Sequence, residues 1–385
     1  MLLSSKRSAL SFALPIFFGT TIGITFLYYA ANVIPNKKFE EFALGKENTT
    51  SLEFVNGVQV HCSDLENSHK CINGYNNSRS GEDIVLWLGN SQLYIINLFK
   101  SGDVTAAHVL HRYVAADSKY YLTFSQPNAS LQEHYLLFEY LTHQLPVTTL
   151  VLPIVFDDMR ETGIRHSLIN AFNNQAVSKR LYNTVIGRKL ISLHGNQNSI
   201  ANDMTALDDT VQKQSEKYLN EGLNEIWRIW EQRVGLRGSF LTSLYVFRNW
   251  LFGINPSSIR RIIPGRYSIN LDALKAVVQS ANEQGIKVLL YIPPLRNDVK
   301  IPYDLDQYGK FKSEIQLLAQ KNGAKFVNLE HLVPAELWGT KASTTLGDEP
   351  EIDFMHFQAG GHQLLANALY GELKAFWSEG THNEF

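Results

Sequence analysis

Cysteine and net charge are both scarce in this chain. Two cysteines among 385 residues exclude a disulfide-dense miniprotein and a zinc site built on thiolate ligands. The 35 lysines and arginines nearly balance the 37 aspartates and glutamates, so the basic excess typical of nucleic-acid binders is missing. We therefore expect no nucleic-acid partner. An apolar content of 44% instead predicts a folded chain that is long enough to bury a sizeable core.

Charge is also absent from residues 9–34, where apolar side chains dominate. A run of this length can span a bilayer as a helix, so we predict one transmembrane anchor. A short cytoplasmic tail at 1–8, which holds Lys6 and Arg7, would precede it. A cleaved signal peptide is the alternative, although residues 29–32 make a poor cleavage site. This prediction places the rest of the chain on the periplasmic, extracytoplasmic side of the cytoplasmic membrane.

Residues 35–80 are polar and rich in Asn, Ser, Gly and Lys, which favours a juxtamembrane stalk. A short hairpin is expected within it, over 52–60. Cys62 and Cys71 lie nine positions apart in this stretch, and a small disulfide-closed loop is the natural interpretation outside the cytosol. Two unrelated free thiols are the alternative.

Strand and helix patterns alternate through residues 81–380, which we expect to form the functional domain. Continuous apolar runs, each typical of a buried parallel strand, are followed by segments with helical spacing. Strands are predicted at 84–88, 120–124, 148–156, 287–292 and 324–329, and helices at 93–99, 130–145, 271–284, 305–322 and 359–376. This alternation predicts an α/β fold, a three-layer open parallel sheet covered by helices.

A stretch of about 120 residues, roughly 161–280, interrupts the alternation and has the pattern of a helical insertion. Within it, residues 226–268 carry seven arginines against one acid, Glu231, with tryptophan and phenylalanine interleaved. A basic, aromatic amphipathic segment of this kind can lie on a membrane surface. The alternative is that its apolar face packs on the sheet domain while its arginines are solvated.

The residues that can carry chemistry lie near the two ends of this domain. Ser91 follows the first strand within Gly-Asn-Ser-Gln, at the sheet end where open α/β folds bind ligands. A serine there can be a nucleophile, although a serine at a helix start is more often an N-cap. Asp353 lies three residues before His356, in a loop expected just before the last helix. Its carboxylate can hold the imidazole Nδ1–H, which leaves Nε2 free to take the serine proton. His362 falls within the predicted last helix and is expected either to be structural or to support a triad residue without touching the substrate.

Gly-x-Ser after the first strand and Asp-x-x-His before the last helix resemble blocks I and V of the SGNH (GDSL-like) hydrolase superfamily. The anchored form with a long insertion is most similar to the envelope O-acyltransferase branch. That branch includes the lipoteichoic acid D-alanylation protein DltD and the polysaccharide O-acetylation proteins. The resemblance spans roughly residues 81–378. It implies an SGNH, flavodoxin-like sheet with Ser91 as nucleophile, His356 as general base and Asp353 as its orienter.

The oxyanion hole is the least defined part of this resemblance. The family's block II glycine and block III Gly-x-Asn-Asp are not plainly present, and other residues stand at the corresponding strand ends. Gln92 and Asn128 are the candidate amide donors. Asp157 or Asp158 would have to be protonated to donate a hydrogen bond. Arg160 would either bind an anionic substrate group or pair with these acids.

These features predict an extracytoplasmic, membrane-anchored serine acyltransferase or esterase. It would modify a cell-envelope glycan or polymer through an acyl-serine intermediate, with acetyl or D-alanyl as examples of the acyl group. Family analogy adds a membrane-bound acyl donor protein as a partner. The alternative is a non-catalytic polysaccharide-binding or assembly protein on a degenerate fold of this type. We expect no cofactor and no metal site.

Overall fold

The computed structural model describes residues 18–21, 23, 25, 49–50, 54–55, 57–63, 65–78, 81–115, 117–195, 244–344 and 349–378. The chain divides into two compact units. The sheet unit comprises Lys46–Asp203, Pro256–Lys341 and Pro350–Phe385, and the second unit comprises Met1–Gly45, Met204–Asn255 and Ala342–Glu349. Most of the predicted anchor and all of the tail at 1–8 lie outside the described residues. Among the described residues, no helix is both long and apolar enough to cross a membrane.

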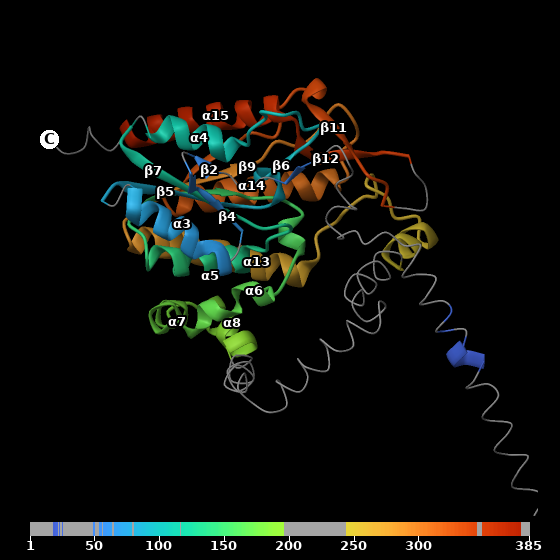
Figure 1. The fold of residues 1–385 in the computed structure, drawn as a ribbon. Helices are drawn as coiled ribbons and strands as arrows, with labels where there is room; N and C mark the ends of the chain where they lie inside the picture. The colour runs from blue at the N-terminus through green and yellow to red at the C-terminus, as the bar shows by residue number, and fades with distance from the viewer. Residues whose placement is uncertain are drawn as a thin grey trace, which may run out of the picture. The chain divides into compact units, whose positions relative to one another are not determined.

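The described part of the sheet unit is built on six parallel strands in the order β10-β9-β8-β5-β7-β4 (Figure 1). Their bounds are β4 (His61–Cys62), β5 (Asp83–Gly89), β7 (Lys119–Ser125), β8 (Val147–Pro153), β9 (Lys287–Ile292) and β10 (Lys325–Asn328). Apart from β4, the order follows the doubly wound pattern 2-1-3-4-5. The five predicted strands are present, and the predicted open parallel sheet is confirmed.

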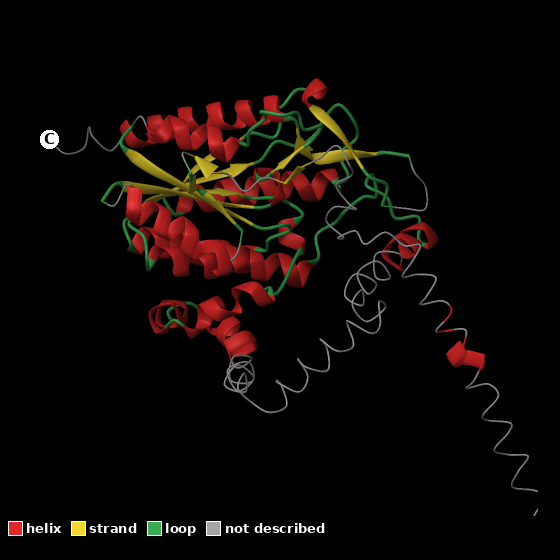
Figure 2. Ribbon diagram, viewed as in Figure 1, coloured by secondary structure: helices red, strands yellow, loops and turns green. Residues whose placement is uncertain are grey.

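Helices cover both faces of this sheet (Figure 2). One face carries α4 (Ala106–Ala115) and α15 (Ala359–Ser378), and the other carries α3 (Leu65–Ser78), α5 (Leu131–Thr142), α13 (Pro264–Glu283) and α14 (Leu305–Lys321). The central strand β5 buries every residue after Asp83, because a parallel strand between two helical layers has no solvent-facing side. An apolar core lies against each face. This is the three-layer arrangement that the alternating pattern predicted.

The sheet unit includes residues that the sequence assigned to a stalk. β4 pairs in parallel with β7 at the sheet edge, and α3 packs beside it on the apolar core. A disulfide joins Cys62 to Cys71, and both side chains are fully buried. The expected stalk is therefore corrected over 58–63 and 65–78, because a two-residue edge strand and a mostly polar helix leave little apolar signal. The predicted hairpin is present as β2 (Phe54–Val55) and β3 (Val58–Gln59).

Two local predictions near the candidate site are corrected by the structure. A 3₁₀ turn at Ser91–Leu93 and a short strand, β6 (Ile95–Ile96), replace the helix expected at 93–99. β6 pairs with β1 (Thr49–Thr50). The loop expected around His356 is instead strand β12 (Glu351–Phe357), which pairs antiparallel with β11 (Trp338–Lys341). Each of these two strands, β6 and β12, pairs with a segment elsewhere in the sequence. The spacing of apolar residues within the strand itself therefore did not predict it.

The described part of the predicted insertion is helical. It contains α6 (His166–Ile169), α7 (Gln175–Tyr182), α8 (Val185–Leu190) and a further helix at 244–251. The insertion does not extend to 280, because α13 begins at Pro264 and packs on α5 as a sheet-covering helix. Proline suits the first helical turn, where its missing N–H needs no partner.

Candidate active site

Ser91 stands on a tight turn at the carboxyl end of β5. The strand ends at Gly89, where a Cβ atom would collide with the side chain of Leu93. Only glycine therefore allows the chain to turn back this closely. Asn90 caps the turn, since its Oδ1 accepts a 3.1 Å hydrogen bond from the backbone N–H of Gln92. β5 also lies where the strand order reverses, which is where open α/β sheets form their ligand crevice.

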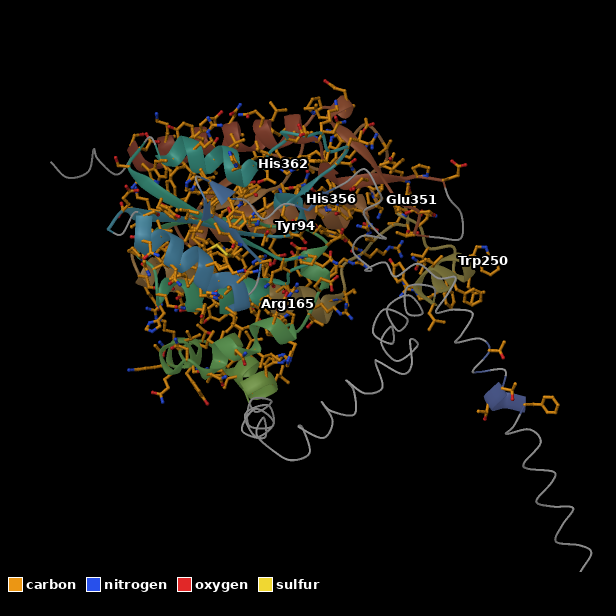
Figure 3. All side chains as sticks on the ribbon, viewed as in Figure 1. Tyr94, Arg165, Trp250, Glu351, His356 and His362 are labelled. Carbon is orange, nitrogen blue, oxygen red and sulfur yellow. A yellow bond between two sulfur atoms is a disulfide. The ribbon has the colours of Figure 1, made fainter. Side chains whose placement is uncertain are left out.

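The structure brings the three residues of the predicted triad together. Ser91 Oγ lies 3.0 Å from His356 Nε2, and His356 Nδ1 lies 2.9 Å from Asp353 Oδ2. Since an ionised carboxylate only accepts hydrogen bonds, Nδ1 carries the proton and Nε2 accepts from the serine hydroxyl. Both His356, labelled in Figure 3, and Asp353 belong to β12. Ser91 and His356 are 265 positions apart in the chain, so only the fold joins them.

Asp353 is held as a carboxylate. It is 2% exposed, and burial by itself would raise its pKa. The charge and hydrogen bond of His356, helped by the Lys341 charge and a backbone N–H, outweigh burial and lower the pKa of Asp353 to about 2. Backbone N–H groups of Met355 and His356 both donate to Oδ1, at 2.9 and 3.0 Å. The carboxylate can therefore orient the imidazole throughout the neutral pH range.

Asn97 supports this end of the triad and was not identified from the sequence. Its Nδ2 lies 3.4 Å from Asp353 Oδ2, 3.3 Å from the His356 carbonyl oxygen and 3.2 Å from the Thr340 carbonyl oxygen. A Cβ atom at Gly339 would collide with the Asn97 amide, so β11 carries a glycine where this side chain enters. Asn97 lies in a segment that was predicted to be helical, and nothing in the neighbouring sequence indicates that its amide contacts residues 340, 353 and 356.

His362 is a structural residue, which was one of the two roles that the sequence left open. Its Nδ1 accepts a 3.1 Å hydrogen bond from the backbone N–H of Ala106, and its Nε2 donates to the Ile95 carbonyl at 3.0 Å. Burial lowers the pKa of His362 to about 4, so the ring is neutral at physiological pH. The ring thereby links α15 to α4 and β6, outside the Ser91–His356–Asp353 line.

The two candidate amide donors have different surroundings. Gln92 is buried, and its Nε2 donates to the carbonyl oxygens of Pro294 at 2.9 Å and Met355 at 2.8 Å. Both amide protons of Gln92 are therefore used within the protein. Asn128 is exposed on the loop after β7, where it adopts a positive φ of 49°. The structure supports a scaffolding contribution from Gln92 instead of a direct contact to an oxyanion.

Asp157 and Arg160 pair with each other, which was one of the two interpretations open for Arg160. Arg160 Nη1 lies 3.3 Å from Asp157 Oδ1. Asp157 also accepts hydrogen bonds from Arg260 and from the Tyr303 hydroxyl, the latter at 3.0 Å. Arg160 Nε donates to the Arg261 carbonyl at 3.0 Å. Asp157 is thus an acceptor at the centre of a cationic cluster and cannot serve as an oxyanion donor in this state.

Asp158 is the acid whose surroundings favour the protonated form. It is 3% exposed, and burial raises the pKa of Asp158 well above its usual range, although the Asn90 hydrogen bond opposes this. Asp158 Oδ2 accepts from Asn90 Nδ2 at 3.0 Å. Asp158, which follows β8, therefore braces the residue that caps the Ser91 turn. The sequence pointed to this pair of adjacent acids but did not separate their roles.

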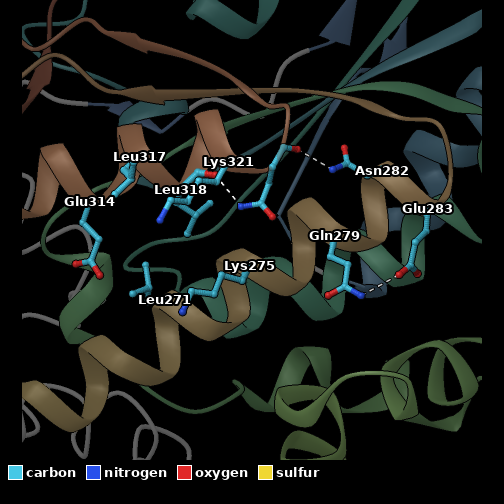
Figure 4. Close-up of a pocket in the computed structure, with 10 residues that line it drawn as sticks. Leu271, Lys275, Gln279, Asn282, Glu283, Glu314, Leu317, Leu318 and Lys321 are labelled. Atoms are coloured by element: carbon cyan, nitrogen blue, oxygen red, sulfur yellow. Dashed lines mark hydrogen bonds between the residues drawn. The ribbon is translucent and has the colours of Figure 1, made fainter.

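Two of the cavities among the described residues differ in their relation to this site. A cavity of about 10 Å³, room for about one water-sized group, lies at the carboxyl ends of β8 and β9. Pro294 and Met355, which hold Gln92, are among its lining residues. A wider cavity of about 510 Å³ lies between α13 and α14, lined by residues outside the triad (Figure 4). Neither of these two cavities is lined by Ser91, Asp353 or His356.

The sequence matches no protein-family model and no curated protein. Similar solved structures include a putative acylhydrolase from Bacteroides fragilis, with 10% sequence identity and a TM-score of 0.36, covering 82% of this chain and 99% of that chain. A GDSL-like lipase from Bacteroides thetaiotaomicron has 10% identity and a TM-score of 0.36, covering 79% and 97%. A catalytic mutant of an acetylxylan esterase from Geobacillus stearothermophilus has 11% identity and a TM-score of 0.36, covering 76% and 95%. Similarity at this level assigns neither family nor activity.

Proposed function

We propose that this protein is a serine acyl-transfer enzyme, an esterase or acyltransferase, whose nucleophile is Ser91. The observation that carries the proposal is the continuous hydrogen-bonded line from Ser91 through His356 to Asp353. A serine hydroxyl is a weak nucleophile until a base takes its proton, and this line supplies both the base and the group that orients it. A serine that only capped a turn would need neither.

The reaction proceeds in two acyl-transfer steps. Ser91 Oγ attacks the acyl carbon as His356 Nε2 takes its proton, and Nε2 then protonates the departing alkoxide or thiolate. An acyl-serine ester remains. An acceptor hydroxyl next gives its proton to Nε2 and attacks this ester, and the Ser91 oxygen leaves and recovers the proton. Asp353 stays ionised and stabilises the imidazolium that forms in each step. Water as acceptor gives hydrolysis, and a sugar hydroxyl gives transfer.

We propose further that the enzyme acts outside the cytoplasm on a cell-envelope glycan or polymer, held at the membrane by the apolar run at 9–34. The disulfide between Cys62 and Cys71 supports this location, because disulfides persist in oxidising compartments. The resemblance to envelope O-acyltransferases supports an acetyl or D-alanyl group and a membrane-bound acyl donor protein as partner.

A fluorophosphonate probe on the full-length chain tests the nucleophile. We expect wild-type protein to be labelled, Ser91→Ala to be unlabelled and His356→Ala to react far more slowly. Ser91→Ala should keep the wild-type melting temperature, because this side chain does not belong to the apolar core. His356→Ala should lower it, because the buried Asp353 carboxylate loses the partner that offsets its burial. Labelling that is independent of Ser91 and His356 would refute the proposal. Turnover of acetylated glycan, with Ser91→Ala as control, then separates transfer from hydrolysis.

A non-catalytic polysaccharide-binding or assembly protein is the second candidate. Two of the predicted oxyanion residues favour it, because neither offers a hydrogen-bond donor to an oxyanion. The Gln92 amide already donates to two carbonyl oxygens, and Asp157 accepts hydrogen bonds. Glycan binding that is equal in wild type and Ser91→Ala, without labelling of Ser91, would support this candidate over the enzyme.

A further inference from the structure

The helix at 244–251 turns its apolar side toward solvent. Leu244, Phe247 and Leu251 recur at helical spacing on one side, and all three are exposed. Trp250, labelled in Figure 3, adjoins them, with its ring centroid 5.7 Å from that of Phe247. Exposed apolar residues continue beyond the helix. We call the whole set the apolar patch, and its members are Leu244, Phe247, Trp250, Leu251, Phe252 and Ile254.

The inward side of the same helix is held by a polar contact. Asn249 is 1% exposed, and its Nδ2 donates to the Thr344 carbonyl at 3.0 Å within the second unit. Its Oδ1 accepts from Arg248 Nη2 at 2.7 Å. Rotating the helix to bury the apolar patch would break the bond to Thr344 and leave a buried carbonyl without its donor, which is costly. The outward orientation of the apolar patch is therefore a specified feature of this unit.

The sequence that contains the apolar patch is basic. Residues 226–255, which all belong to the second unit, carry four arginines and one acid, Glu231. Arg248 is exposed beside the apolar patch, with its guanidinium carbon 4.7 Å from the centroid of the Tyr245 ring. Tryptophan and phenylalanine flanked by arginine match the water–lipid boundary, where rings enter the acyl region and guanidinium groups meet phosphate. Charge complementarity thus favours an anionic lipid surface as the occupant.

We propose that the apolar patch docks on an anionic membrane surface and holds the second unit there. The exposure of Phe247 and Leu251 within the second unit supports this docking. The predicted anchor at 9–34 would make docking intramolecular, so a weak intrinsic affinity would suffice. This inference is independent of the chemistry at Ser91.

A single nitroxide label can test the docking in full-length protein reconstituted in vesicles of phosphatidylcholine and phosphatidylglycerol. The chain's two cysteines are joined in the disulfide, so an introduced thiol is the labelling site. Phe252→Cys, at the most exposed position of the apolar patch, is compared with Leu317→Cys on α14, which is 49% exposed. Collisions with oxygen, which concentrates in lipid, are measured against collisions with a water-soluble nickel chelate.

We expect the label at 252 to collide more with oxygen than with nickel, and the label at 317 to do the reverse. The preference at 252 should weaken in vesicles of phosphatidylcholine alone. Nickel access at 252 equal to that at 317 would overturn the proposal. Shielding of 252 from both reagents would also overturn it, because it would show a protein contact in place of lipid. An unchanged preference in neutral vesicles would refute the role given to the arginines.

Discussion

The side-chain amide of Gln92 donates a 2.8 Å hydrogen bond to the carbonyl oxygen of Met355, the residue before His356. A second bond, of 2.9 Å, reaches the Pro294 carbonyl after β9. The residue that follows the proposed nucleophile is thus tied to the strand that carries the proposed base. This link helps to set the 3.0 Å separation between Ser91 Oγ and His356 Nε2.

Gln92→Met should slow labelling of Ser91 by about 10²-fold, because a small misplacement of the base is enough to lose this much reactivity. The free energy of unfolding should fall by about 1–3 kcal/mol, since the carbonyl groups of Pro294 and Met355 lose their donor. Labelling rates and urea unfolding measure the two effects. Gln284→Met is the matched control, as that amide also donates two bonds, to Ser280. Equal labelling rates for Gln92→Met and Gln284→Met would count against a positioning role for Gln92.

Asp353 should stabilise the fold above about pH 4 and lose this contribution as pH falls toward 2. Its folded-state pKa of about 2 lies below the unfolded value of about 3.9, so its stabilisation is present above the unfolded value and disappears as pH falls through the folded value. The shift corresponds to roughly 2–3 kcal/mol. Urea unfolding of wild type and Asp353→Asn across this range should show the difference between them shrinking. The exposed acid Asp306, changed to Asn, is the control. A difference that is constant with pH would refute this linkage.

Asp158 should have the opposite pH dependence. Burial raises the pKa of Asp158 above that of an unfolded aspartate, so its cost to folding grows as pH rises above about 4. Asp158→Asn keeps an oxygen that can accept from Asn90 and cannot ionise. Scanning calorimetry should show a higher melting temperature than wild type in mildly alkaline buffer and near equality at about pH 4. A lower alkaline melting temperature for Asp158→Asn than for wild type would contradict the assignment.

Removal of the disulfide should lower the stability of the sheet unit but leave Ser91 reactive toward the fluorophosphonate probe. Changing Cys62 and Cys71 to Ala together opens a loop of nine positions, for which the chain-entropy cost is about 3 kcal/mol. Both side chains are fully buried, so lost packing adds to this figure. Urea unfolding measures the loss, and labelling of Ser91 under native conditions should persist. An unfolding free energy equal to that of wild type would show that the bond contributes nothing to stability.

Central strands were predictable from the sequence, whereas edge and hairpin strands were not. β5, β7 and β9 are covered on both faces, so almost every residue is apolar and the run is visible locally. β4 has two residues at the sheet edge, and its apolar partners lie in α3 among polar neighbours. β12 is a strand because it forms hydrogen bonds with β11. The pattern of residues 351–357 alone does not indicate that pairing.

The candidate site divides in the same way. Ser91 was identifiable because it follows a buried strand. Asp353 and His356 were identifiable because they are only three positions apart in the sequence. The roles of Asn97 and Gln92 were not identifiable, because each acts through a carbonyl or carboxylate more than 200 positions away. Amide side chains carry no signature of such a distant partner.

The sequence by itself determined the α/β alternation, the place of the proposed nucleophile after the first central strand and the Asp-x-x-His pair. Each of these follows from residues close together in the chain, where burial and spacing act locally. Only the tertiary structure decided that Ser91 meets His356, that burial raises the pKa of Asp158, and that the apolar side of the helix at 244–251 is exposed. These outcomes depend on which distant segments share hydrogen bonds and on which groups lose water, and both are set by packing across the whole fold.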